Sequence, residues 1–400
     1  MSATGTQIPV ARPLLGEWEI EAVRRVVQSG WITQGPEVAA FEAEFAAFVG
    51  AGHACAVSNC TTGLHLALKV VGVGPGDEVI TVSHSFIATA NAIRYCGAVP
   101  VFVDIEPEGF NIDPGLVAAA ITPKTKAILC VHQLGMPCDL ARIVALGRDH
   151  GIPVVEDAAC ASGSEILWDG RWERIGKPHA DIACFSFHPR KLLTTGDGGM
   201  LTTNVAEFDA KLRLWRQHGM GVSDVVRHGS PRVIFESYPE LGYNYRMTDL
   251  QAAIGRVQLA RLPGLISERR RLADLYRDGL SQIDGVTAPA EKPWTRSNWQ
   301  SYCITLPERL DQASIMQTLL DRGISTRRGV MNAHREAAYG EQGSHRVSGD
   351  LSRSIAAQEK SIILPLFAQM TEAQLAFVVE SLQQACSASS TPASRLLSAS

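Results

Sequence analysis

Short apolar runs alternate with helix-length segments along the first half of the chain. The runs are rich in Val, Ile, Leu, Ala and Cys and lie at 54–57, 78–83, 99–104, 126–131, 152–157 and 181–187. Near-continuous apolar runs of this length are typical of strands buried on both faces. Helices are expected between them, from Ser58 onward and at 86–95, 113–121 and 138–150. The alternation predicts an α/β fold with a mostly parallel sheet sandwiched by helices.

The remaining segments are mainly helical in pattern. Amphipathic helices are expected at 17–28, 41–48, 211–218, 313–322 and 372–384, and strands at 301–306 and 362–366. Residues 219–240 read as a loop, and Thr248 is a plausible cap for a helix that Pro263 and Gly264 should break. A long charged helix is expected at 266–283. We therefore predict a large α/β domain at 1–263, a smaller C-terminal α+β domain at 264–385, and a disordered Ser/Ala-rich tail at 386–400.

Composition narrows the function classes. The chain has 400 residues, 46% hydrophobic and 20% charged, with a net charge of −4 and no basic block, so neither nucleic acid nor an anionic membrane is an expected partner. No apolar run approaches the roughly 18 residues of a membrane helix. Nine scattered cysteines without a C-x-x-C pair suggest reduced thiols rather than a zinc site or disulfide framework. Residues 1–9 lack signal-peptide features, and a cytoplasmic location is expected.

Candidate chemistry converges on one edge of the predicted sheet. Ligands of parallel α/β sheets lie outside the carboxyl ends of the strands. The turn after the first strand, the segment 83–86, His132, Asp157 and Lys191 all fall at such ends. We therefore expect these side chains to surround a single site.

Lys191 follows a strand that Pro189 ends, and it precedes a turn containing Gly196, Gly198 and Gly199. A lysine delivered by a strand end onto a glycine-rich turn is a candidate Schiff-base amine. Taken alone, the pattern also fits an ordinary surface lysine.

Two other positions suit a phosphorylated, flat ligand. The small polar residues of 58–62 begin a helix, and a helix start offers free N–H groups to an anion, although a plain N-cap has the same pattern. Asp157 closes an apolar strand, where an unpaired carboxylate is costly to bury. It could pair with a protonated ring nitrogen, or act as a helix cap or structural ion pair.

Six motifs in this order resemble the DegT/DnrJ/EryC1/StrS aminotransferases, from about Ile8 to Leu382. They are GWITQGP at 30–36, TTGLHLAL at 61–68, SFIATANAI at 85–93, EDAA at 156–159, SFHPRK at 186–191 with TTGDGG at 194–199, and GYNYRMT at 242–248. The resemblance implies the fold-type I aspartate aminotransferase fold, pyridoxal 5'-phosphate (PLP) as the cofactor, and a homodimer.

The resemblance also implies roles for matching residues. Lys191 would form the Schiff base with the coenzyme, and Asp157 would pair with its pyridinium nitrogen. Ser186, Thr61 and Thr62 would contact the phosphate. Phe86 would stack on the ring, and Asn244 would reach the phosphate in the neighbouring subunit. Cys160 stands where the family usually has His or Gln beside the coenzyme hydroxyl, and a thiol is a weak hydrogen-bond partner.

The function implied is transfer of an amino group from glutamate or glutamine to a keto sugar, nucleotide-linked, in bacterial surface-polysaccharide or secondary-metabolite biosynthesis. Cyclitols and octulosonates are rarer acceptors in the family. A PLP-binding regulator without transaminase activity is the alternative from another class. In some relatives histidine replaces this lysine and the reaction is a dehydration. The presence of Lys191 disfavours that activity here. A metal hydrolase using His84, His132 and His188 is a poor fit, because these lack metal-ligand spacing.

Overall fold

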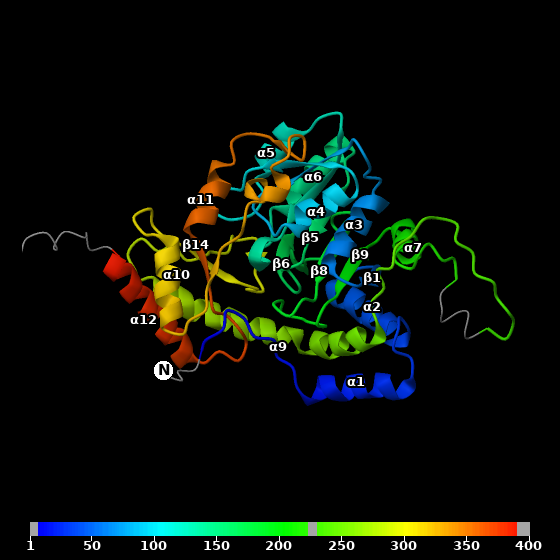
Figure 1. Ribbon diagram of the computed structural model, residues 1–400, viewed down its shortest axis with the longest axis horizontal. Coiled ribbons are helices and arrows are strands. Elements are labelled where there is room, and N and C mark those ends of the chain that lie inside the picture. Colours follow the sequence, from blue (N-terminus) through cyan, green and yellow to red (C-terminus); the bar gives the residue numbers. More distant parts are fainter. Residues whose placement is uncertain (1–6, 223–229, 390–400) are drawn as a thin grey trace, which may run out of the picture.

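A central sheet organises the molecule, for which a computed structural model describes residues 7–222 and 230–389 (Figure 1). Eight strands run in the order β1-β9-β8-β5-β4-β2-β3-β13. Their bounds are β1 His53–Val57, β9 Gly199–Thr203, β8 Ile182–Ser186, β5 Val154–Asp157, β4 Thr125–Val131, β2 Glu78–Val82, β3 Val99–Val103 and β13 Arg346–Val347. Only β9 runs antiparallel to its neighbours β1 and β8. The predicted mostly parallel sheet is confirmed.

Helices cover both faces of this sheet because alternate residues of each strand point to opposite sides. In β1, Ala54 and Ala56 join one core while Cys55 and Val57 join the other. The first core is packed by α2 (Pro36–Val49), α5 (Pro114–Ala120), α6 (Leu140–His150) and part of α9 (Asp249–Leu280). The second is packed by α3 (Cys60–Val70), α4 (Ala88–Tyr95) and α7 (Ala206–Trp215).

A smaller region lies beside the large sheet (Figure 1). Its antiparallel sheet has the order β11-β14-β12, with bounds Tyr302–Thr305, Ser361–Leu364 and Arg327–Arg328. The helices α10 (Gln312–Asp321) and α12 (Glu372–Ser389) pack with the end of α9 around a separate apolar core. The helix α11 (Ser352–Lys360) leads into β14. These elements agree with the expected small α+β region.

Two parts of the sequence-based prediction are wrong. The helix α9 is not broken at Pro263, because Leu262, Leu265 and Ile266 are buried along its length. This burial offsets the roughly 3 kcal/mol that an internal proline costs. The division of the chain into domains at 263 stays a prediction. The tail predicted from 386 is helical as far as Ser389, and Cys386 lies in the small core. The rest of that tail lies outside the described residues.

Several short elements are missed. They are β9, the edge strand β13, and a three-stranded sheet of β10 (Thr295–Arg296), β6 (Glu165–Trp168) and β7 (Arg171–Arg174). The strands β6, β7, β10 and β13 have two to four residues, too few to show a hydrophobic pattern in one sequence. The five residues of β9 directly follow a glycine-rich turn and include two threonines, so their apolar run is short. The helix α1 (Glu17–Ser29) agrees with its prediction, and it packs against α9.

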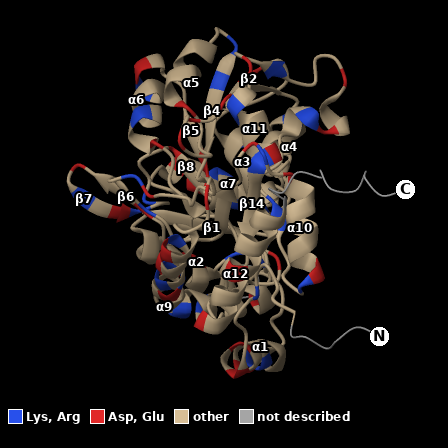
Figure 2. Ribbon diagram, turned by 90° about the vertical axis from the view of Figure 1, so that its left-hand side faces the viewer, with Lys and Arg blue, Asp and Glu red and all other residues tan. Residues whose placement is uncertain are grey.

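Charged residues are interspersed rather than grouped. Acidic and basic side chains are mixed along helices such as α9 (Figure 2), and several of them form i,i+3 or i,i+4 pairs, such as Arg271 with Glu268. Among the helices of the described residues, none is both long and apolar enough to cross a membrane.

Candidate active site

A cavity of about 970 Å³ opens at the carboxyl ends of β4, β5 and β8. Its lining includes seven of the eight predicted site residues: Thr61, Thr62, Phe86, Asp157, Cys160, Ser186 and Lys191. The parallel register explains the convergence, since Val131 pairs with Asp157 and Asp157 with Cys184, two residues before Ser186. The eighth, Asn244, is exposed and lies outside the lining.

Lys191 lies on the turn between β8 and β9. Its backbone N–H donates to the carbonyl of His188 (2.8 Å), which closes the turn after Pro189. Its Nζ lies 3.0 Å from Cys160 Sγ. Burial lowers the pKa of Lys191, but Cys160, Asp157 and Cys60 outweigh burial and leave this pKa above its ordinary value. The surface-lysine alternative does not describe this side chain.

The glycines after Lys191 serve different purposes. Gly196 alone of the three adopts a positive φ, of 84°. Gly199 is needed for close approach, since a Cβ there would lie 2.7 Å from the carbonyl carbon of Asn59 and 2.8 Å from the nitrogen of Cys60. The strand β9 therefore holds the start of α3 against the site.

The start of α3 faces the cavity. Asn59 caps it, accepting the N–H of Thr62 on Oδ1 (3.0 Å). The Thr62 hydroxyl donates to the Asn59 carbonyl (2.8 Å) and lies 3.2 Å from Ser58 Oγ. First-turn N–H groups have no intrahelical acceptor, so Cys60 and Thr61 present theirs at the positive end of the helix dipole. This geometry suits a phosphate.

Asp157 is buried at the end of β5. Its Oδ1 accepts the N–H of Ala159 (3.1 Å) and its Oδ2 accepts the hydroxyl of Thr89 (2.7 Å). Burial raises the pKa of Asp157, although these two bonds, Lys191 and His132 act in the opposite direction. A carboxylate held in this way favours a cation beside it.

Thr89 belongs to the functional residues that the sequence analysis missed. It lies on the first turn of α4, four residues after Ser85, and the two hydroxyls are 2.8 Å apart. The i,i+4 spacing of Ser85 and Thr89 is the signal that the sequence offers for this contact, and it does not indicate that Asp157 is the partner.

Two more missed residues brace the loops that carry Lys191 and Cys160. The side chain of Asn298 donates to the carbonyls of Cys160 (2.9 Å) and Ser162 (3.0 Å). The side chain of Gln300 donates to the carbonyl of Arg190 (3.0 Å). Trp299, which lies between them, has a positive φ of 52°. This backbone turn allows Asn298 to bond the loop of Cys160 and Gln300 to bond the loop of Lys191. Asn298 and Gln300 lie 110 or more positions from the residues that they bond, so no local sequence pattern could indicate these contacts.

Phe86 is 64% exposed at the cavity. A large aromatic ring left this accessible is free to stack on a flat ligand. Ser186 is buried at the end of β8, where its Oγ accepts the N–H of His188 (3.5 Å).

Two of the three histidines of the metal-hydrolase alternative bond residues outside the predicted site, while His188 lines the cavity and its Nδ1 accepts the N–H of Arg190 (3.2 Å). His132 is fully buried and bonds Glu156 through Nε2 (2.7 Å), while His84 Nδ1 lies 3.2 Å from Asn332 Oδ1. Across residues 7–222 and 230–389, no group of three or more His, Cys, Asp or Glu side chains could hold a metal ion.

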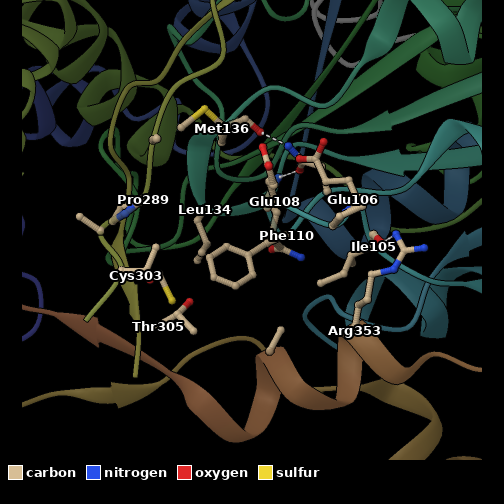
Figure 3. A pocket seen from close by; sticks show the side chains of 18 of the residues that line it. Ile105, Glu106, Glu108, Phe110, Leu134, Met136, Pro289, Cys303, Thr305 and Arg353 are labelled. Atoms are coloured by element: carbon tan, nitrogen blue, oxygen red, sulfur yellow. Dashed lines mark hydrogen bonds between the residues drawn. The ribbon is translucent and has the colours of Figure 1, made fainter. Parts of the chain in front are cut away.

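A second cavity of about 620 Å³ shares Gln133 and Leu134 of its lining with the first. Figure 3 shows this second cavity, whose labelled residues come from the loop after β3, the turn after β4, the small region and α11. None of the predicted site residues lines it.

The residues of the first cavity fit PLP. They provide a buried carboxylate for a protonated ring nitrogen, an amine for an aldehyde, a helix start for a phosphate and an exposed aromatic ring. The volume of about 970 Å³ lies at the upper end of the range of about 300 to 1,000 Å³ that is usual for ligand sites.

Known proteins share this architecture. The DegT/DnrJ/EryC1/StrS aminotransferase family profile matches residues 13–383. The spore coat polysaccharide biosynthesis protein SpsC of Bacillus subtilis (strain 168) is 37% identical over 380 residues, 94% of this chain and 96% of that protein. The crystal structure of the aminotransferase TlmJ from Streptoalloteichus hindustanus is 36% identical, with a TM-score of 0.86 over 96% of this chain and 99% of that one.

Spr1654 from Streptococcus pneumoniae, solved in its PLP form, is 28% identical, with a TM-score of 0.87 over 96% of this chain and all of that one. The family match spans nearly the whole described chain and agrees with the PLP-compatible cavity. The chain therefore belongs to the DegT/DnrJ/EryC1/StrS aminotransferase family and is a PLP-dependent aminotransferase.

Proposed function

We propose that this enzyme moves an amino group from glutamate or glutamine to a nucleotide-linked keto sugar. The observation that carries the proposal is the arrangement of Lys191 and Asp157 at one cavity, with the start of α3 beside them. The relation to SpsC, which is named for polysaccharide biosynthesis, supports a sugar acceptor.

Bound PLP supplies the electron sink for charge that develops at the donor Cα. We assign Lys191 Nζ the transfer of the Cα proton, acting in turn as base and acid. Asp157 would hold the proton on the ring nitrogen. The first-turn N–H groups of α3, with Thr61, Thr62 and Ser186, would hold the phosphate. Phe86 would stack on the ring, and Cys160, beside Lys191, would be close to the coenzyme hydroxyl.

Arginines support the nucleotide link. Arg190, Arg327 and Arg328 line the cavity. Arg328 has only a long contact of 3.9 Å to Glu336, and no acidic side chain among the described residues forms an ion pair with Arg190 or Arg327. Guanidinium groups bind phosphate through paired hydrogen bonds, so a pyrophosphate suits this wall.

The acceptor can be tested directly. The PLP enzyme is converted to its amino form with L-glutamate or L-glutamine, and keto sugars are then added with and without a nucleotide. We expect nucleotide-linked keto sugars to restore the original absorption spectrum faster than the free sugars, cyclitol ketones or octulosonates. Arg327→Gln should reduce this preference, while Arg309→Gln, a distant surface change, should not. Equal rates with free sugars would contradict the nucleotide link.

We also propose a homodimer with shared sites. The segment 230–241 projects from the body of the molecule (Figure 1), and its Val233, Phe235 and Leu241 are each more than 80% exposed. Apolar side chains exposed together favour a protein partner. Asn244 follows this segment and is itself exposed, as a residue that serves the partner's phosphate site would be.

A further inference from the structure

Asp157 does not stand alone at the bottom of the cavity. Its Oδ2 accepts the hydroxyl of Thr89 (2.7 Å), and Thr89 Oγ1 lies 2.8 Å from Ser85 Oγ. All three side chains are buried, with 5% exposure or less. Hydrogen bonds in such a setting are stronger than in water and polarise one another.

The direction of both bonds follows from proton counting. An ionised carboxylate can only accept, so the single hydroxyl proton of Thr89 goes to Asp157. Thr89 Oγ1 must then accept the proton of Ser85. The chain Ser85→Thr89→Asp157 therefore points its donors at the carboxylate.

We propose that Thr89, supported by Ser85, is a positioning residue that keeps Asp157 ionised and aimed at the ring nitrogen of PLP. The inference rests on the proposed role of Asp157. The bonds of Ser85 and Thr89 connect the start of α4, which follows Phe86, to Asp157. Asp157 is the residue that would keep the ring nitrogen of the coenzyme protonated. Burial favours the protonated acid, and the Thr89 bond opposes it.

The second bond to Asp157 does not replace this one. The N–H of Ala159 reaches Oδ1, at a longer distance of 3.1 Å, and leaves Oδ2 to Thr89. A carboxylate that lost Thr89 would be free to rotate about its remaining contact, since no other described group bonds Oδ2.

The test measures the dissociation constant of PLP for the apo-protein between pH 5 and 9. Thr89→Val keeps the shape and removes the hydroxyl. We expect PLP binding to weaken about 10- to 100-fold, as for loss of one hydrogen bond to a charged group. The midpoint of the acid loss of binding should move upward by about one pH unit, because Asp157 protonates more readily. Thr89→Ser should restore both values to within a few-fold of wild type.

Thr81 provides the matched control. Its hydroxyl is also fully buried and donates to the Leu129 carbonyl (2.8 Å), but it lies outside the cavity lining. Thr81→Val should leave the affinity and the pH midpoint unchanged. Unaltered affinity and midpoint in Thr89→Val as well would overturn the proposal.

The variant Asp157→Asn distinguishes a failure of the proposed Thr89 role from a failure of the proposed Asp157 role. If Asp157→Asn also bound PLP normally, the role of Asp157 would fail, and with it the proposal. If only Asp157→Asn were impaired, the role of Thr89 alone would fail. In the Asp157→Asn background, Thr89→Val should add little, since the carboxylate that Thr89 bonds is gone.

If Thr89→Val does not fold, Ser85→Ala provides the test. A weakening of PLP binding of about 3- to 10-fold supports the proposed chain of hydrogen bonds, and unchanged binding overturns it.

Discussion

The amine of Lys191 lies 3.0 Å from the thiol of Cys160, and this pair lies at the cavity that also contains Asp157. By resemblance to the family, Cys160 is expected on the hydroxyl side of the coenzyme. Its contact with Lys191 gives that thiol a partner before any coenzyme binds.

Lys191→Ala should abolish turnover and covalent capture of the coenzyme. Borohydride reduction of the PLP-loaded protein should tag the peptide that contains Lys191 in the wild type and no peptide in the variant, by mass spectrometry. Lys126→Ala, an exposed lysine at the start of β4, is the control and should be tagged at Lys191 like the wild type. An active, untagged Lys191→Ala enzyme would rule the mechanism out.

Cys160→Ala should lower the pKa of Lys191. Burial pulls this pKa down, and Cys160 is the first of the groups that raise it. A lower pKa leaves more neutral amine at a given pH, so PLP should bind covalently at lower pH than in the wild type. Stopped-flow absorption from pH 6 to 9 measures this shift. An identical pH profile in the two proteins would show that the thiol does not act on the amine.

Gly199→Ala should weaken PLP binding, because its Cβ would push into the backbone of Asn59 and Cys60. The turn that holds the phosphate must then move, and we expect at least a 10-fold rise in the PLP dissociation constant. Gly264→Ala is the matched control, since nothing lies within 4 Å of its Cβ. That change lies inside α9 and should stabilise the protein by about 0.5–1 kcal/mol without altering PLP affinity.

Acid should destabilise the protein through Glu42. Burial alone would raise its pKa, but Arg216 and Arg213 hold that pKa below its ordinary value. A lowered folded pKa contributes stability that is complete above the ordinary value of 4.5 and is lost as the pH falls through the lowered one. Glu42→Gln leaves Arg216 buried without its charge partner and should cost about 3–5 kcal/mol at pH 7.

Urea unfolding at pH 7 and at several pH values below 4.5 measures this effect. The gap between wild type and Glu42→Gln should narrow as the pH falls, because the wild type loses the same interaction. Glu21→Gln, an exposed residue in α1, should differ little from the wild type at either pH. A gap that does not depend on pH would place the loss in packing rather than charge.

Phe235→Asp combined with Leu241→Asp should convert the proposed dimer to a monomer, because these side chains are 88% and 87% exposed and the changes would place charge in the interface. Light scattering after size-exclusion chromatography reports the mass. Phe377→Asp, which changes an exposed aromatic on α12, should leave the mass unchanged. If the wild type is already monomeric, the shared site is wrong.

The sequence by itself determined the parallel sheet and most of the candidate site. Near-continuous apolar runs can be recognised in the sequence without knowing which strands pair, and the carboxyl ends of parallel strands must share an edge. Lys191, Asp157 and the turn before α3 were therefore identifiable from where their strands end.

Only the tertiary structure decided the residues that hold this site together. Thr89, Asn298 and Gln300 act through bonds to residues 68, 138 and 110 positions away. The hydrogen-bond partner of a hydroxyl or amide side chain depends on which distant residues the fold brings beside it. The same reason explains α9, in which burial of Leu262 and Leu265 against the rest of the protein overrides the local tendency of Pro263 to end a helix.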